Sequence, residues 1–144
     1  DDVSSLRVVE ASEGDLLTPG TVYIAPAGRH LHLGRDRNGH ICAHLDVKPL
    51  DKPHRPAVDV LFSSAADACG DRVLGVVMTG MGTDGLLGSA HIKAKGGTIL
   101  TEAESSCVVY GMPRAVDEAS LSDARFPLPE MAGRMMEWAG WQRS

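Results

Sequence analysis

The stretch VVMTGMGTDGLLG at residues 76–88 constrains the fold of this chain more than any other feature. An apolar run typical of a buried strand enters a turn with glycines at positions 80, 82 and 85. An apolar stripe then resumes at the spacing of a helix. The stretch therefore predicts a strand, a tight glycine turn and a helix, which is the repeating unit of parallel α/β sheets.

The flanking sequence extends this pattern on both sides. Short segments with strand character precede the stretch, and the last two flank an Asn-Gly turn that favours a hairpin: residues 6–10, 21–25, 31–33 and 41–45. Further segments alternate between helix and buried strand: residues 56–69, 72–78, 86–94, 98–101, a short helix from Pro113, and 128–138. We predict an α/β fold in one domain over residues 1–144, with a doubly wound, mostly parallel sheet, an antiparallel hairpin and helices on both faces (a three-layer αβα arrangement).

Bulk properties exclude several classes of protein. Fourteen basic against nineteen acidic side chains leave a net charge of −5, which disfavours nucleic acid as a partner. The three cysteines form no C-x-x-C pair and predict neither a disulfide framework nor a structural zinc site. No apolar stretch approaches the roughly 20 residues of a membrane span, so we expect no membrane insertion and a cytoplasmic location.

The glycines at 80, 82 and 85 also satisfy the G-x-G-x-x-G pattern of dinucleotide-binding turns. Glu102 lies about 20 positions on, where such sites place an acid for the ribose hydroxyls. Asp84 argues against this interpretation, because a fixed carboxylate at the helix N-terminus competes with a pyrophosphate. Asp84 could instead cap the helix or orient a catalytic histidine, and those two roles are compatible.

The remaining candidate residues have plainer interpretations. Four histidines alternate with apolar residues in the hairpin, which predicts a solvent-facing side rather than a metal site: His30, His32, His40 and His44. His54 precedes a helix and could line the edge of the sheet, although an entry-loop position is the simpler expectation. Cys107, Met131, Met135 and Met136 are expected to fill apolar core.

Three segments, in order and at these separations, resemble one known family: RPAVDVLF, GVVMTGMGTDG and ESSCVVYGMPRAV. They are similar to the catalytic domain of bacterial chemotaxis protein-glutamate methylesterases of the CheB type, and TVYIAPAGRHLHL resembles that family's hairpin segment. The resemblance implies hydrolysis of glutamyl methyl esters on chemoreceptors, and deamidation of particular receptor glutamines, by a Ser-His-Asp mechanism without a cofactor or metal. It assigns the aspartate to Asp84 and an oxyanion-stabilising N–H to Met81.

The chain departs from the family pattern in one respect. It contains neither a Gly-x-Ser-x-Gly turn for the nucleophile nor a His-Met-Pro segment for the base. The resemblance then implies the C-terminal two-thirds of the catalytic domain, without a receiver domain and with little or no esterase activity by itself. A methylated chemoreceptor cytoplasmic domain is the expected partner, with a response-regulator receiver domain as a further one in the parent protein, meaning the complete protein to which these residues belong.

Two alternatives remain open from the sequence. The chain could be a non-catalytic binding or regulatory module that docks through exposed strand edges. The dinucleotide-binding domain is the other.

Overall fold

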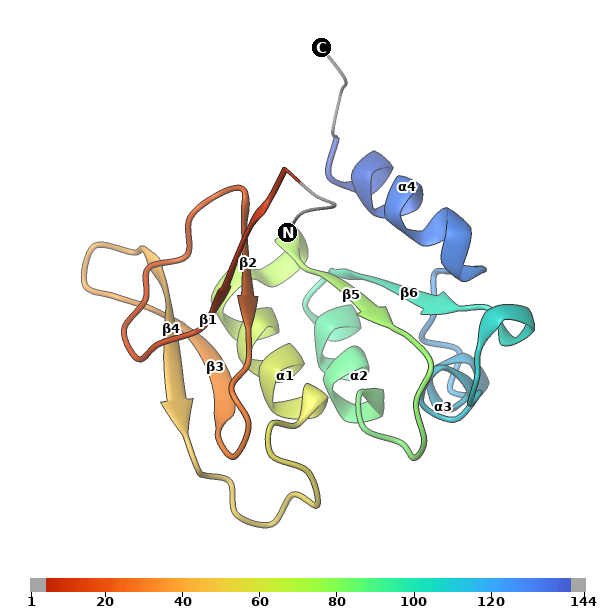
Figure 1. Cartoon of the computed structure of the whole chain (residues 1–144), viewed down its shortest axis with the longest axis horizontal. Helices are drawn as coiled ribbons and strands as arrows, with labels where there is room; N and C mark the ends of the chain where they lie inside the picture. Colours follow the sequence, from red (N-terminus) through yellow and green to blue (C-terminus); the bar gives the residue numbers. More distant parts are fainter. Residues whose placement is uncertain (1–4, 141–144) are drawn as a thin grey trace.

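The computed structural model describes residues 5–140 and has mixed α/β architecture (Figure 1). The strands are β1 (Arg7–Glu10), β2 (Thr21–Ile24), β3 (His30–Arg35), β4 (Ile41–Asp46), β5 (Leu74–Val77), β6 (Thr98–Glu102) and β7 (Ala124–Phe126). The α-helices are α1 (Val58–Cys69), α2 (Leu86–Ala94), α3 (Met112–Glu118) and α4 (Leu128–Trp138), with short 3₁₀ turns η1 (Gly70–Arg72) and η2 (Glu104–Ser106).

The strands form three small groups. β5, β6 and β7 make a parallel sheet, β1 and β2 make a parallel pair, and β3 and β4 make an antiparallel hairpin. Mostly parallel pairing with one antiparallel hairpin confirms the predicted fold class. Among the described residues β5 pairs only with β6, so its other edge has no neighbouring strand.

Two apolar clusters hold these groups to the central helices. One cluster packs α1 and α2 against the parallel sheet through Ala66, Val77, Ile92, Ile99 and Val116. The second packs the hairpin and the segment after β1 together, through Ala11, Leu31 and Ala43 with α1 residue Leu61 at its side. In Figure 1, α1 and α2 therefore lie side by side between the hairpin and the parallel sheet.

The two helices approach each other closely because Gly88 has no side chain. A Cβ atom at Gly88 would lie 2.5 Å from Phe62 Cβ, closer than real Cβ atoms come, and a tight 3.1 Å from Asp59 Cα. Gly75 in β5 has the same role against the sheet neighbour, since its Cβ would lie 2.7 Å from Ile99 Cδ1. The α1–α2 contact brings the N-termini of both helices to the carboxyl end of β5.

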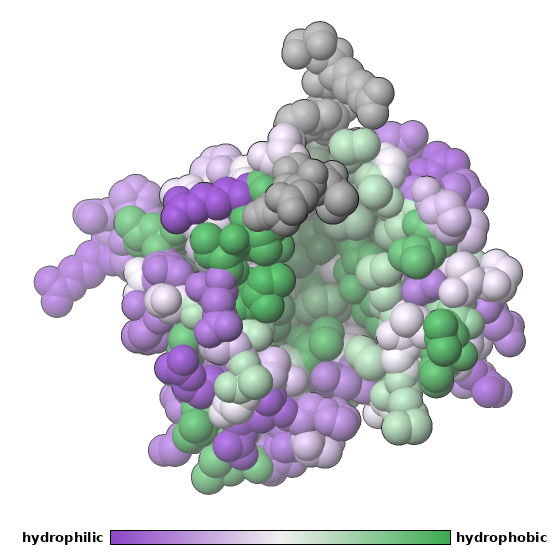
Figure 2. All heavy atoms as spheres, in the orientation of Figure 1, coloured by the Kyte–Doolittle hydropathy of each residue, from purple (hydrophilic) through white to green (hydrophobic). Residues whose placement is uncertain are grey.

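The space-filling view shows a hollow with an apolar floor between the two halves of the molecule (Figure 2). Several large apolar side chains on the short strands and after β5 are exposed: Val8, Ile24 and Met78. Exposed apolar side chains next to an unpaired strand edge are a feature of surfaces that bind another chain.

Some local predictions were wrong. His30 was expected on a solvent face but is fully buried, because its ring lies between Pro49 and Ala57: Ala57 N–H donates to Nδ1 at 3.2 Å, and Nε2 lies 3.1 Å from Pro49 O. Met135 and Met136 are about 40 % exposed, so in this part of α4 only Met131 fills core as predicted.

Other differences concern short elements. The central strand is Leu74–Val77 rather than residues 72–78, because η1 occupies Gly70–Arg72. The three-residue strand β7 was missed because three residues carry no clear period. Within residues 5–140, no helix is long and apolar enough to cross a membrane.

Candidate active site

The turn between β5 and α2 lies at the carboxyl end of the parallel sheet, where ligands bind in such folds. Gly82 and Gly85 have φ angles of +93° and +101°, in the left-handed region that favours glycine. At Gly80 the constraint is space, since a Cβ there would lie 2.5 Å from Met112 Sδ and the Met112 side chain would have to move. The glycines thus permit a tight turn and a close approach to the start of α3.

Asp84 points across to the neighbouring helix. Its Oδ2 accepts the Val58 N–H at 2.8 Å and its Oδ1 accepts the Asp59 N–H at 2.9 Å. The carboxylate therefore caps α1, whose own N-cap residue, Ala57, has no side chain that could do so. The expectation that Asp84 caps the helix following it was wrong, because the contact between the helices places the α1 N-terminus within its reach.

Asp59 makes the reciprocal contact. Its Oδ1 accepts the Gly85 N–H at 2.9 Å and the Gly88 N–H at 2.8 Å, so the first turn of α1 caps the N-terminus of α2. The sequence analysis did not single out Asp59. The sequence shows an acid in the first turn of a helix, but only the packing of α1 on α2 shows which N–H groups Asp59 binds.

This exchange of carboxylates argues against a dinucleotide site. The N–H groups of α2 that would receive a pyrophosphate already donate to Asp59. Glu102, the expected ribose ligand, is 1 % exposed and accepts hydrogen bonds from Thr79 N–H and the Ser106 hydroxyl. Both positions that a dinucleotide needs are filled by the protein itself.

The loop that carries Met81 is held in place while Met81 projects from it. Gly80 N–H donates to Val109 O at 3.0 Å, and Gly80 O accepts from Gly111 N–H and Met112 N–H at 3.1 and 2.8 Å. The Met81 side chain is 82 % exposed, and its N–H meets no hydrogen-bond acceptor within the described part of the chain. A fixed, unpaired N–H of this kind can donate to an oxygen that develops negative charge.

A cavity of about 360 Å³ opens beside Asp84. Lys52 and His54, from the segment between β4 and α1, line it together with Asp84 and Gly82. The structure thus brings His54 and Asp84 to the same cavity, although no hydrogen bond joins them. Asp59 lines the cavity as well, so two carboxylates face Lys52 and His54 there.

The remaining candidate groups do not converge on this site. Burial is the largest cause raising the pKa of the Cys107 thiol, and the Glu102 charge adds to it, so Cys107 is held in the protonated form. Within residues 5–140, no group of three or more His, Cys, Asp and Glu side chains could hold a metal ion.

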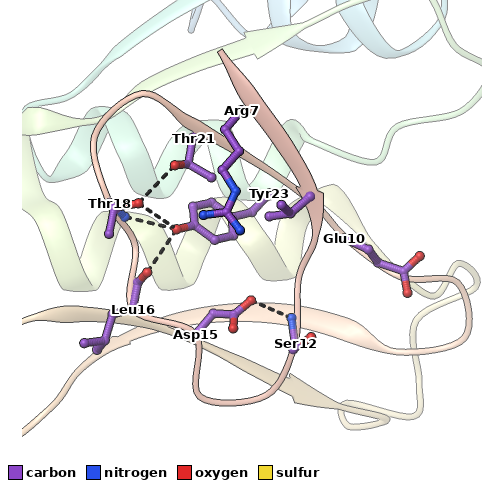
Figure 3. Close-up of a pocket in the computed structure, with 9 residues that line it drawn as sticks. Arg7, Glu10, Ser12, Asp15, Leu16, Thr18, Thr21 and Tyr23 are labelled. Atoms are coloured by element: carbon purple, nitrogen blue, oxygen red, sulfur yellow. Dashed lines mark hydrogen bonds between the residues drawn. The ribbon is translucent and has the colours of Figure 1, made fainter. Parts of the chain in front are cut away.

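A second cavity of about 370 Å³ lies beside β1 and β2 (Figure 3). Its polar groups bond largely to one another: the Tyr23 hydroxyl donates to Leu16 O at 2.9 Å and accepts the Thr18 N–H at 3.1 Å, and Asp15 accepts the Ser12 N–H at 2.8 Å. These bonds stabilise the loop between the two strands and leave no arrangement of acid, base and nucleophile.

Comparison with known proteins gives a consistent result. The family model described as CheB methylesterase matches residues 1–135. The chain is 53 % identical over 128 residues to protein-glutamate methylesterase/protein-glutamine glutaminase 5 of Myxococcus xanthus, covering 88 % of this chain and 36 % of the relative. A counterpart in Desulfitobacterium hafniense is 44 % identical over 136 residues, covering 94 % of this chain and 34 % of the relative.

The structural comparison agrees with the sequence matches. The CheB methylesterase catalytic domain of Thermotoga maritima superposes with a TM-score of 0.91 at 38 % identity, covering 96 % of this chain and 72 % of that domain. The chain therefore spans little more than a third of the length of these curated relatives and about three quarters of the solved catalytic domain.

Proposed function

The chain belongs to the CheB methylesterase family, and on that premise we propose that it supplies the aspartate and one oxyanion donor of a Ser-His-Asp protein-glutamate methylesterase. The parent protein hydrolyses glutamyl methyl esters on chemoreceptors and deamidates particular receptor glutamines. The serine and histidine come from parts of the parent protein outside residues 1–144, which contain no matching motif.

The observation that carries this proposal is the environment of Asp84. A carboxylate has about four lone-pair positions, and the α1 N-terminus uses two of them at Asp84. Asp84 thus retains capacity to accept a further hydrogen bond from the Nδ1–H of a histidine, which fixes the tautomer of that histidine and stabilises the imidazolium as the serine attacks.

Met81 supplies the second function. Attack on the ester carbonyl places negative charge on its oxygen, and a preorganised N–H stabilises that charge in the transition state. Only the N–H direction matters for this role, because the Met81 side chain projects into solvent.

The substrate and partners follow from the same premise. A methylated chemoreceptor cytoplasmic domain presents the ester, a receiver domain of the response-regulator type controls access to it, and the reaction takes place in the cytoplasm.

The test is methanol release from methylated receptor by the parent protein. We expect Asp84→Asn to lower kcat by roughly 10³–10⁴-fold, because the histidine loses the partner that fixes its tautomer. Asparagine keeps only one of the two oxygens that cap α1, so we also expect a loss of about 1–2 kcal/mol of stability, and kcat is compared per folded protein. Asp67→Asn on the exposed side of α1 is the matched control and should retain full activity.

Two results would contradict the proposal. One is turnover by residues 1–144 alone at the rate of the parent protein, since that would require a different nucleophile. The other is a parent protein whose activity is unchanged by Asp84→Asn.

The exposed strand edges favour one alternative, a non-catalytic module that binds a partner. Val8, Ile24 and the unpaired edge of β5 offer apolar contact and free backbone groups. Binding of unmethylated and methylated receptor fragments with equal affinity and without methanol release by the parent protein would support this alternative over the esterase.

A further inference from the structure

Glu102 is a buried carboxylate for which the proposed reaction has no use. It ends β6 and is 1 % exposed. Acids are almost never this deeply buried unless they are paired, because the charge loses its hydration. No ion pair among residues 5–140 includes Glu102, so hydrogen bonds must compensate for its burial.

Both oxygens of Glu102 accept a hydrogen bond. Oε1 accepts the Thr79 N–H at 2.9 Å, and Oε2 accepts the Ser106 hydroxyl at 2.8 Å. Ser106 Oγ in turn accepts the Leu128 N–H at 2.9 Å. The carboxylate therefore joins Thr79, two residues after β5, to η2 and to the start of α4. Hydrogen bonds to a charged acceptor are roughly twice as strong as neutral ones.

Thr79 begins the loop that presents Met81. Its Oγ1 donates to Val109 O at 3.2 Å and accepts the Val109 N–H at 2.9 Å, and its N–H is the group that Glu102 binds. Glu102 and Val109 thus fix the main chain on the side from which it enters Gly80.

The direction of the Met81 N–H follows from the peptide group it belongs to. That group also contains Gly80 C=O, which Gly111 N–H and Met112 N–H hold at 3.1 and 2.8 Å. Since a trans peptide is planar, its N–H points opposite to its C=O. A displacement of Thr79 would tilt this plane and turn the Met81 N–H away.

We propose that Glu102 is a positioning residue of the methylesterase, which aims the Met81 N–H at the oxyanion by holding the Thr79 N–H. The inference rests on the proposed function, in which Met81 is the donor. It replaces the ribose-binding role that the spacing after the glycine turn suggested for Glu102.

Three substitutions in the parent protein distinguish the position of the acceptor oxygen at residue 102 from its charge. Glu102→Gln keeps an oxygen that can accept the Thr79 N–H, so we expect kcat within about threefold of wild type. Glu102→Asp keeps the charge but withdraws it by one methylene, and Glu102→Leu removes it. Loss of an oxyanion donor costs roughly 10²–10³-fold and misplacement less, so we expect kcat to fall about 10-fold in Glu102→Asp and up to about 100-fold in Glu102→Leu, with KM within about twofold.

Asp123→Leu is the matched control for lost stability. Asp123 accepts the Ile99 N–H at 2.7 Å, near the opposite end of the same strand, and lies away from the Met81 loop. This variant should lower the thermal midpoint while kcat stays at the wild-type value. We rank wild type, Glu102→Gln, Glu102→Asp and Glu102→Leu once by kcat and once by thermal midpoint. Two different rankings support the positioning role.

The outcomes distinguish this inference from the proposed function. A wild-type parent protein that releases no methanol overturns both. An active parent protein in which Glu102→Asp retains wild-type kcat, or in which kcat falls only in proportion to folded protein, overturns the positioning role alone. If Glu102→Leu does not fold, the comparison of Glu102→Gln with Glu102→Asp still decides the matter.

Discussion

The reciprocal capping of α1 and α2 by two carboxylates makes Asp59 the strongest test of how this structure is stabilised. Asp59→Ala removes the carboxylate whose Oδ1 accepts both the Gly85 N–H at 2.9 Å and the Gly88 N–H at 2.8 Å. Gly85 and Gly88 are themselves buried, so water replaces the lost acceptor only in part.

The magnitude follows from those two bonds. Hydrogen bonds to a charged group contribute about 1.5–3 kcal/mol each, and loss of a helix cap costs about 0.5–2 kcal/mol. Asp59 is half-buried, and partial access of water reduces the sum. We therefore expect Asp59→Ala to lower the free energy of unfolding by about 2–3 kcal/mol. Asp59→Asn keeps a neutral oxygen at the same place and should cost about 1 kcal/mol.

Urea unfolding followed by circular dichroism measures this difference. The midpoint should fall while the m-value stays constant, since the surface exposed on unfolding does not change. Asp67→Ala provides the control on the same helix. Its carboxylate is exposed and pairs with His91 at 2.7 Å, and such a surface pair contributes at most about 1 kcal/mol.

The reasoning is refuted if Asp59→Ala costs less than about 0.5 kcal/mol or no more than Asp67→Ala. Either result would mean that the carboxylate does not hold the α2 N-terminus in solution.

Three further predictions concern other parts of the chain. Gly88→Ala should destabilise by about 1–3 kcal/mol in urea unfolding, because its Cβ would lie 2.5 Å from Phe62 Cβ, whereas Gly133→Ala in the open interior of α4 should stabilise by about 0.5–1 kcal/mol. The hydrogen bond to Asp117, with burial and the Asp117 charge, raises the pKa of Tyr110 from 10.0 to about 12. Hydrogen bonds with Thr18 instead lower the pKa of Tyr23. Absorbance at 295 nm should therefore show Tyr110 titrating at higher pH than Tyr23. Because the folded-state pKa of Tyr110 is the higher one, its contribution to stability is complete below pH 10 and is lost as the pH rises to about 12, a loss that Tyr110→Phe should abolish.

Much of the fold could be predicted from local patterns. The Asn-Gly turn, the stripe on residues 58–69 and the apolar run before Gly80 correspond to the hairpin, α1 and β5 of the structure. Each pattern lies within one element and reflects which side of that element is buried, so it can be recognised without knowing the neighbours. The three-residue strand β7 is too short to carry such a pattern.

The residue types at the site could be predicted from the sequence, but the hydrogen bonds between them could not. The spacing of residues 80–85 indicated a tight turn carrying an acid, and the resemblance pointed to Asp84 and Met81. The prediction for His30 was wrong because period-two alternation in a hairpin assumes that one face is exposed to solvent. In the structure, Pro49 and Ala57 cover this end of β3.

Tertiary structure alone decided which partner each polar group meets. Asp84 caps α1 rather than α2, Asp59 caps α2, and Glu102 binds the Thr79 N–H. These pairs are separated by 23–29 positions along the chain, and only the packing of α1 on α2 and of β6 beside β5 brings them within hydrogen-bond distance. Sequence by itself determined the elements and the residue types available at the turn, because those depend on local periodicity and backbone conformation. The hydrogen bonds that orient the turn depend on contacts between distant segments, and these exist only in the folded chain.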